Sequence, residues 1–114
     1  MPLVAGTAVM REVIYEMSRK GLGMTCVVDA EGRLQGIITD GDLRRHMTTL
    51  PDILERAAGD VMTKGPTTID RSMLAVQALS LMEQRKITSL PVIDDERVVI
   101  GVVHLHDLWR TQMF

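Results

Sequence analysis

Apolar residues recur at every fourth position in two stretches of the chain, and this spacing predicts an amphipathic helix in each. The repeated positions are Val9, Val13 and Met17 within residues 7–20, and Leu74, Ala78 and Met82 in the later stretch. Side chains at this spacing share one face of an α-helix. Thr7 and Ser72 come just before the apolar positions, and their hydroxyls are suited to cap the first helical turn.

Each predicted helix is followed by two short β-rich runs with turn-forming residues between them, a pattern typical of strands. The runs are residues 25–29 and 34–39 in the first half, and residues 90–94 and 98–104 in the second. A short extended piece precedes each helix, at Leu3-Val4 and Thr68-Ile69, and a further helix begins near Asp42 and near Asp107. The predicted fold class is therefore α+β, with the order β-α-β-β-α occurring twice.

The two halves align with each other when the chain is shifted by 65 residues, the separation of Gly36 and Gly101. The segments that begin at these glycines, GIITDGDLRRH and GVVHLHDLWRT, both continue into Asp-Leu-x-Arg. The same shift aligns Cys26-Val-Val-Asp29 with Pro91-Val-Ile-Asp94. Such self-similarity over a long span indicates a duplicated supersecondary unit.

The duplication divides the chain into a first unit (residues 1–48), a connector (residues 49–66) and a second unit (residues 67–114). Within the connector, residues 51–58 are predicted to form a short helix that Gly59 ends. Asp60-Val-Met-Thr63 then leads into the second unit. A matching lead-in for the first unit would need residues before Met1, so we expect the chain to begin partway into that unit.

Composition excludes several classes of function. The net charge of −2 offers no basic footprint, and 3% aromatic residues offer no stacking platform, so nucleic-acid binding is not expected. No apolar run is long enough to cross a bilayer, and the first residues lack the pattern of a signal peptide, so we expect no membrane association. Cys26 is the single cysteine, which favours a reduced, cytoplasmic setting.

Thr39 and Asp42 are the first candidates for ligand contacts. They are three residues apart at a predicted strand-to-helix junction, which brings both side chains to one edge of the first turn. The amides of that turn favour an anion, the threonine hydroxyl can donate to a phosphate oxygen, and the carboxylate can accept from two ribose hydroxyls. Gly41 leaves room for a ligand, and Arg44 or Arg45 adds positive charge. The alternative is that Thr39 and Asp42 merely cap the helix.

The second copy carries a different centre, with His104, His106 and Asp107 at the positions of Thr39, Gly41 and Asp42. Histidine can donate to an anionic oxygen and gains charge near its ordinary pKa of ~6.5, so this site would hold another anion or bind more tightly at mildly acid pH. The alternatives are that the two histidines bind a metal ion or that they have a purely structural role. Two imidazoles with one carboxylate do not complete a recognised set of ligands, so we predict no metal site and no cofactor.

These segments together resemble the CBS (cystathionine-β-synthase) domain. The shared features are an apolar-Pro-Val-Ile-Asp strand and a Gly-apolar-apolar-Thr-x-x-Asp-Leu segment that opens a helix. Two such units in tandem resemble a CBS pair, or Bateman module, whose halves are related by pseudo-twofold symmetry. Residues 21–25, 39–45 and 104–108 more narrowly resemble the C-terminal CBS pair of bacterial arabinose-5-phosphate isomerases. In that family an N-terminal sugar-isomerase domain makes a precursor of Kdo, the lipopolysaccharide sugar.

The resemblance implies a regulatory module, not an enzyme, that binds a nucleotide or nucleotide-sugar. In nucleotide-binding CBS domains the matching threonine and aspartate hold phosphate and ribose, and the base lies against two neighbouring strands. These strand floors would be Leu3-Val4 with Thr25-Cys26, and Thr68-Ile69 with Leu90-Pro91, although Cys26 replaces an expected proline. CMP-Kdo, the activated end product of the pathway, is the favoured ligand, and AMP or ATP comes next. The parent chain would supply the N-terminal sugar-isomerase domain.

A second interpretation is structural. Tandem CBS units commonly associate through their helices, and most soluble oligomers are twofold symmetric, so a homodimer is expected. In that case the clefts would be vestigial and the module would serve oligomerisation. An independent hydrolase or isomerase has no nucleophile and base to support it, and we predict no catalytic residues.

Overall fold

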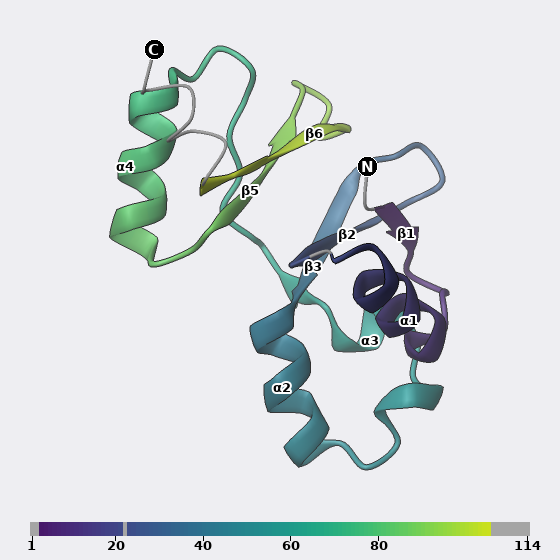
Figure 1. Cartoon of the computed structure of the whole chain (residues 1–114). Helices are drawn as coiled ribbons and strands as arrows, with labels where there is room; N and C mark the ends of the chain where they lie inside the picture. Colours follow the sequence, from purple (N-terminus) through teal and green to yellow (C-terminus); the bar gives the residue numbers. More distant parts are fainter. Residues whose placement is uncertain (1–2, 22, 106–114) are drawn as a thin grey trace. The chain divides into compact units, whose positions relative to one another are not determined.

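The computed structural model describes residues 3–21 and 23–105 of the 114-residue chain (Figure 1). The chain forms two compact units, with the boundary between Pro66 and Thr67. Both units combine helices with strands, and the predicted α+β class is confirmed. The units are described separately below.

The first unit is built on a four-stranded sheet with the strand order β1-β2-β3-β4. Its strands are β1 (Leu3–Ala5), β2 (Met24–Val28), β3 (Leu34–Thr39) and β4 (Thr63–Lys64). β1 runs parallel to β2, and β3 is antiparallel to both β2 and β4. β4 comes from the predicted connector, so this segment completes the sheet of the first unit.

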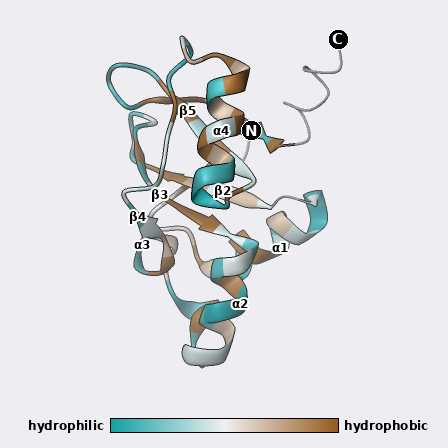
Figure 2. Cartoon of the chain, turned by 90° about the vertical axis from the view of Figure 1, so that its left-hand side faces the viewer, coloured by the Kyte–Doolittle hydropathy of each residue, from teal (hydrophilic) through white to brown (hydrophobic). Residues whose placement is uncertain are grey.

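The helices of the first unit pack on this sheet through apolar faces. They are α1 (Met10–Lys20), α2 (Asp40–Thr49), the 3-10 helix η1 (Ile53–Glu55) and α3 (Ala58–Val61). The apolar stripe of α1, formed by Met10, Val13 and Met17, is buried in one core cluster with Val27 of β2 and Ile38 of β3. All five residues of β2 are buried, which explains why four of them are apolar, with Thr25 as the one polar residue, instead of alternating with exposed polar residues. The hydrophobic colouring of the strands is visible in Figure 2.

The second unit repeats the arrangement as far as it is described. α4 (Ala75–Arg85) is followed by β5 (Ser89–Ile93) and β6 (Val99–His104), which pair antiparallel. Ile69 makes an isolated parallel bridge to Val92, at the position of the repeat where Val4 of β1 pairs in parallel with Val27 of β2. Each strand pair also shifts register at the equivalent place, between Val27 and Val28 and between Val92 and Ile93. The helix predicted near Asp107 lies outside the described residues.

The predicted helix starts were wrong. α1 begins at Met10 after the N-cap Val9, and α4 begins at Ala75 after Leu74, so neither Thr7 nor Ser72 is a cap. The amide of Met10 instead donates to the Arg56 carbonyl at 2.8 Å, a tertiary partner that makes a capping hydroxyl unnecessary. The Ser72 hydroxyl donates to Asp70 at 2.6 Å within its own turn.

The predicted short helix at residues 51–58 was also wrong. The chain makes only one 3-10 turn there, and α3 begins at Ala58 with Gly59 inside it. Arg56 is extended (φ −80°, ψ 157°), which breaks the helix. Its conformation is fixed by the hydrogen bond to Met10 and by the adjoining bridge between Val9 and Ala57.

Candidate functional site

Thr39 and Asp42 cap α2 reciprocally at the junction with β3. The Asp42 amide donates to the Thr39 hydroxyl oxygen at 3.1 Å, and the Thr39 amide donates to Asp42 Oδ2 at 3.1 Å. This is a capping box, so the capping interpretation of the two residues describes their contacts within the chain. The Thr39 hydroxyl accepts in this bond and keeps its own proton for donation.

Two further side chains hold the Asp42 carboxylate, whose side chain is 8% exposed. The Thr63 hydroxyl of β4 donates to Oδ2 at 3.3 Å, and the Arg45 guanidinium donates to Oδ1 in an ion pair. Oδ2 is therefore bound by groups from two strands, whereas Oδ1 is bound by the side chain of Arg45, which is 70% exposed. An exposed cation can be displaced or rotated at little cost. Oδ1 is thus the side of the carboxylate that is open to exchange of partners.

The sheet brings the predicted floor of this site next to the capping residues. Leu3 pairs with Cys26, Cys26 with Ile37, and Ile37 with Thr63, so one row of neighbouring residues crosses all four strands. Thr25 and Cys26 are buried, and Val4 is half-buried. Leu3 is exposed, with 36% of its surface accessible to solvent. Burial raises the pKa of the Cys26 thiol to about 11, so this side chain is neutral at physiological pH.

Gly41 and the two arginines of α2 differ in their surroundings. Gly41 is exposed, and a Cβ there would meet only Arg45 and Thr39, each at 3.8 Å, so the fold itself does not require glycine. Arg45 pairs with Asp42. Arg44 instead lines a groove of about 420 Å³ between α1 and α2, together with residues such as Ile14 and Met47. Of the two arginines, the structure therefore brings Arg45, and not Arg44, to the carboxylate.

The second unit has a partial counterpart of the site around Thr39 and Asp42. The Nδ1 atom of His104 lies 2.8 Å from the Ser89 hydroxyl, across the β5–β6 pair. Leu90 and Pro91 are buried, and Ile69 holds the edge of β5 by donating its amide to the Pro91 carbonyl at 3.1 Å. Thr68, next to Ile69, is half-buried. The predicted site residues His106 and Asp107 lie outside the described residues.

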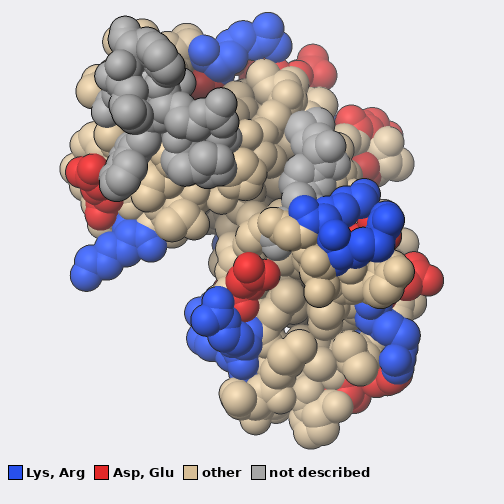
Figure 3. Space-filling view, viewed as in Figure 1, with Lys and Arg blue, Asp and Glu red and all other residues tan. Residues whose placement is uncertain are grey.

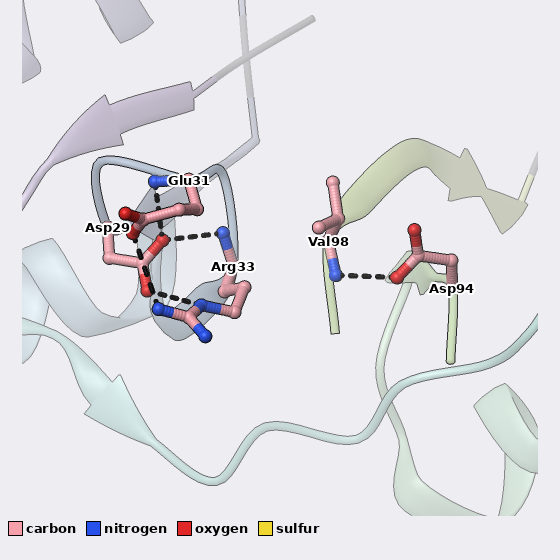
Figure 4. A network of polar contacts seen from close by, with 5 residues as sticks. All are labelled: Asp29, Glu31, Arg33, Asp94 and Val98. Carbon is pink, nitrogen blue, oxygen red and sulfur yellow. Dashed lines mark hydrogen bonds and ion pairs between the residues drawn. The ribbon is translucent and has the colours of Figure 1, made fainter. Parts of the chain in front are cut away.

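Two other carboxylates have a structural role in the hairpin turns (Figure 4). Asp29 accepts from the amides of Glu31 and Arg33 at 3.0 and 2.8 Å, and Asp94 accepts from those of Glu96 and Val98 at 2.9 Å each. The hydrogen bond from the Arg33 amide is the main reason why the pKa of Asp29 is lowered. These contacts tighten the turns and leave the aspartates without a part in the candidate site.

Thr63 is the contact that the sequence analysis missed. It is 21 residues from Asp42 and belongs to a segment interpreted as a connector. The one available signal was the Asp60-Val-Met-Thr63 lead-in, whose threonine was not assigned to any site.

Neither the charged side chains nor the possible metal ligands indicate a further site among the described residues. On the face drawn in Figure 3, blue and red side chains are interspersed and form no extended basic patch. Within residues 3–21 and 23–105, no three histidine, cysteine, aspartate or glutamate side chains are grouped as metal ligands would be. No helix among the described residues has both the length and the apolar character needed to span a membrane.

Comparison with known proteins places these observations in a family. The CBS domain family matches residues 2–49 and 58–108. Arabinose 5-phosphate isomerase KdsD of Yersinia pestis is 44% identical to the chain over 110 residues, which make up 96% of this chain and 33% of that protein. KdsD of Escherichia coli strain K12 matches with the same identity and coverage. The chain thus spans about a third of the length of these curated relatives.

Solved structures share the fold at lower identity. The crystal structure of CBSX2 in complex with AMP has a TM-score of 0.89 at 22% identity, covering 99% of this chain and 87% of that one. The CBS domain pair of protein MJ0100, in complex with 5′-methylthioadenosine and S-adenosyl-L-methionine, has a TM-score of 0.84 at 24% identity, covering 99% and 89%. At these identities the likeness concerns the fold.

Proposed function

The chain belongs to the CBS domain family, and we propose that its pair of CBS units regulates an arabinose-5-phosphate isomerase by binding a nucleotide or nucleotide-sugar. The family makes the chain a regulatory module and not a catalytic domain. The isomerase, the N-terminal domain that carries it, and the Kdo pathway of lipopolysaccharide synthesis are inferred from the 44% identity to KdsD. The proposed setting is the cytoplasm, where sugar nucleotides are made.

The proposal rests on the contacts that the Asp42 carboxylate makes. Its Oδ2 atom is fixed by the Thr39 amide and the Thr63 hydroxyl, so the carboxylate is oriented before any ligand binds. Its Oδ1 atom is paired with the exposed Arg45. Ribose hydroxyls would replace Arg45 at Oδ1, and the released guanidinium would be available to a phosphate group. The Thr39 hydroxyl would donate its proton to the same phosphate.

The strand row beside Asp42 would receive the base. Leu3 and Val4 on β1 are exposed and half-buried and would contact the base, whereas Thr25 and Cys26 on the neighbouring strand β2 are buried. CBSX2 was crystallised with AMP, which supports an adenine nucleotide as a ligand of the fold. CMP-Kdo remains our favoured ligand, because an end product is a suitable signal for a pathway enzyme. Its ribose would bind Asp42 in the first unit, or Asp107 at the corresponding position of the second.

Calorimetric titration of the chain with CMP-Kdo, AMP and ATP tests the proposal. We expect at least one of these ligands to bind, and Asp42→Asn to weaken that binding by about tenfold or more because a carboxylate-to-hydroxyl hydrogen bond is lost. Glu12→Gln is the matched control, since it removes the same charge from an exposed position in the first turn of α1, away from the proposed site. Absence of heat with all three ligands at millimolar concentration would contradict sensing, as would equal binding by the Asp42→Asn and Glu12→Gln variants.

A second function, dimerisation, is favoured by the groove between α1 and α2. Ile14, Met17, Leu43 and Met47 give it an apolar floor, and Met47 is 53% exposed. Arg44 and Asp40, which also line the groove, have opposite charges and would pair reciprocally across a twofold axis. We propose that a second copy of the chain covers this groove and that the module forms a homodimer through its helices.

Sedimentation velocity distinguishes this second function. Met47→Glu should convert the dimer to a monomer, because the new charge would be buried without a partner. Tyr15→Glu is the control: Tyr15 is an equally exposed apolar side chain of the neighbouring helix α1, 63% exposed, but it lies outside the groove. A wild-type chain that is monomeric at high micromolar concentration would refute the dimer without affecting the nucleotide proposal.

A further inference from the structure

The chain itself fills most of the hydrogen-bond positions of the Asp42 carboxylate. The two oxygens of a carboxylate offer about four acceptor positions. The Thr39 amide and the Thr63 hydroxyl both donate to Oδ2, and the Arg45 guanidinium donates to Oδ1. The two neighbouring hydroxyls of a ribose need two acceptor positions, and about one is left. A ribose therefore binds Asp42 with both hydroxyls only after Arg45 has moved.

The ion pair between Arg45 and Asp42 differs from an ordinary surface pair in the burial of its acid. The Asp42 side chain is 8% exposed, whereas that of Glu16, which pairs with Arg19 at the same spacing of three residues, is 42% exposed. Water weakens an ion pair less when it has little access to the carboxylate. A ligand that displaces Arg45 also replaces a charged donor by neutral hydroxyls, which form weaker hydrogen bonds to a carboxylate. Arg45 is thus a competitor of the ribose.

The side chains of Arg45 and Thr39 both approach Gly41. A Cβ built at Gly41 would lie 3.8 Å from Nη1 of Arg45 and 3.8 Å from the Thr39 hydroxyl oxygen. A guanidinium and a hydroxyl that keeps its proton are both donors to phosphate oxygens. Glycine is a weaker helix former than alanine, so its presence in the first turn of α2 leaves space at a cost in helix stability. An anion at Gly41 would be within reach of both donors.

We infer that Arg45 makes the first unit selective for phosphorylated nucleosides, because it competes with the ribose for Asp42 until a phosphate group at Gly41 accepts the guanidinium. A nucleoside has to displace Arg45 without offering it another acceptor. A nucleotide supplies the phosphate, so the guanidinium exchanges one anionic partner for another and the ribose gains both positions. Binding of phosphate and binding of ribose are then coupled. The inference rests on the proposed nucleotide function and adds its ligand class.

Calorimetric titration of the Arg45→Met variant tests the inference, with AMP and adenosine and with CMP and cytidine as matched pairs. Methionine keeps a long side chain and has no hydrogen-bond donor. Nucleotide binding at the site that Asp42→Asn weakens should fall by about tenfold or more, because the phosphate loses a charged donor. Nucleoside binding should instead increase about threefold, because the competitor is gone. The preference for the nucleotide over its nucleoside should therefore fall by about thirtyfold.

The gain in nucleoside affinity separates a lost competitor from a damaged fold, because an unfolded variant would bind neither compound. The variant should fold, since the Arg45 side chain is 70% exposed. Arg19→Met is the matched control: it removes the same charge and an ion pair of the same spacing, with Glu16, from α1. Its preference for the nucleotide should equal that of the wild type.

Two results would overturn the inference and leave the proposed nucleotide function intact. One is an unchanged preference for the nucleotide in Arg45→Met, and the other is an equal change of preference in Arg19→Met. If none of the four compounds binds at millimolar concentration, the inference also fails. The proposed function fails with it only when CMP-Kdo does not bind either.

Discussion

Gly21 and Lys86 adopt the same left-handed backbone conformation at the ends of two equivalent helices. Gly21 ends α1 with φ 65° and ψ 34°, and Lys86 ends α4 with φ 57° and ψ 44°. In both, the amide of the cap residue donates back to carbonyls of the last helical turn. This conformation costs a residue with a Cβ about 1–2 kcal/mol that glycine avoids. The fold thus imposes one backbone geometry on both copies, and only the first copy has the residue best suited to it.

Replacing Lys86 by glycine should stabilise the second unit by about 1 kcal/mol, because the left-handed cap is relieved of its strain. Hydrogen exchange of the α4 amides measures this change within the second unit. Arg85→Gly is the control, since Arg85 is the last residue inside the same helix, where glycine should lower stability by about 1 kcal/mol. Equal destabilisation by both substitutions would show that the Lys86 side chain stabilises the native state in another way.

Replacing Thr39 by alanine should lower the free energy of unfolding by about 1 kcal/mol, because the Asp42 amide loses its partner in the capping box. Urea denaturation checks the value. Thr39→Ser keeps the hydroxyl and should remain close to the wild type. If Thr39→Ser is as unstable as Thr39→Ala, the threonine methyl group, and not the cap, is what stabilises this junction.

The sequence predicted those elements whose signals are local. The strand boundaries at residues 34–39 were predicted to the residue, and those of the other strand runs to within one residue, because β-rich runs bounded by turns describe them completely. The resemblance also put Leu3-Val4 next to Thr25-Cys26, and Leu3 does pair with Cys26 in the sheet, while their contact with a ligand stays a prediction. The repeat made each interpretation stronger, since each element was seen twice.

The parts that were not predicted depend on contacts between distant residues. α1 starts at Met10 because the Arg56 carbonyl, far along the chain, accepts its amide proton. Thr63 binds Asp42 because β4 pairs with β3, and nothing in the spacing of a lead-in segment reveals that pairing. The choice between Arg44 and Arg45, by contrast, follows from helix spacing: Arg45 is three residues after Asp42 and shares its face, whereas Arg44 is only two residues after it.

Gly36 and Gly101 should respond differently to alanine, although they occupy the same position of the repeat. Gly36→Ala should destabilise the first unit by about 1–3 kcal/mol, because its methyl group would be 2.7 Å from the Thr63 carbonyl oxygen. Gly101→Ala should leave the second unit at least as stable, since alanine is less flexible in the unfolded chain. Hydrogen exchange of the β3 and β6 amides compares the two variants. Equal losses would show that Gly101 is also closely packed.

Stability should fall above pH 9 because of Cys26. Burial raises the pKa of its thiol from 9.0 to about 11, so between these values the unfolded chain loses the proton while the folded chain keeps it. The unfolded state then binds fewer protons, and the free energy of unfolding decreases as the pH rises. The thiol has no effect below pH 9, and the total loss by pH 11 is roughly 2–3 kcal/mol.

Urea denaturation of the wild type and of Cys26→Val between pH 8 and pH 11 measures this loss. Valine fills the buried position without a titrating group, so the difference between the two curves removes the contributions of lysine and tyrosine side chains, which titrate in both proteins. The difference should be constant up to pH 9 and then shift steadily in favour of the variant. A difference that is independent of pH would mean that the thiol ionises as readily in the folded chain as in the unfolded one, and that β2 admits water at Cys26.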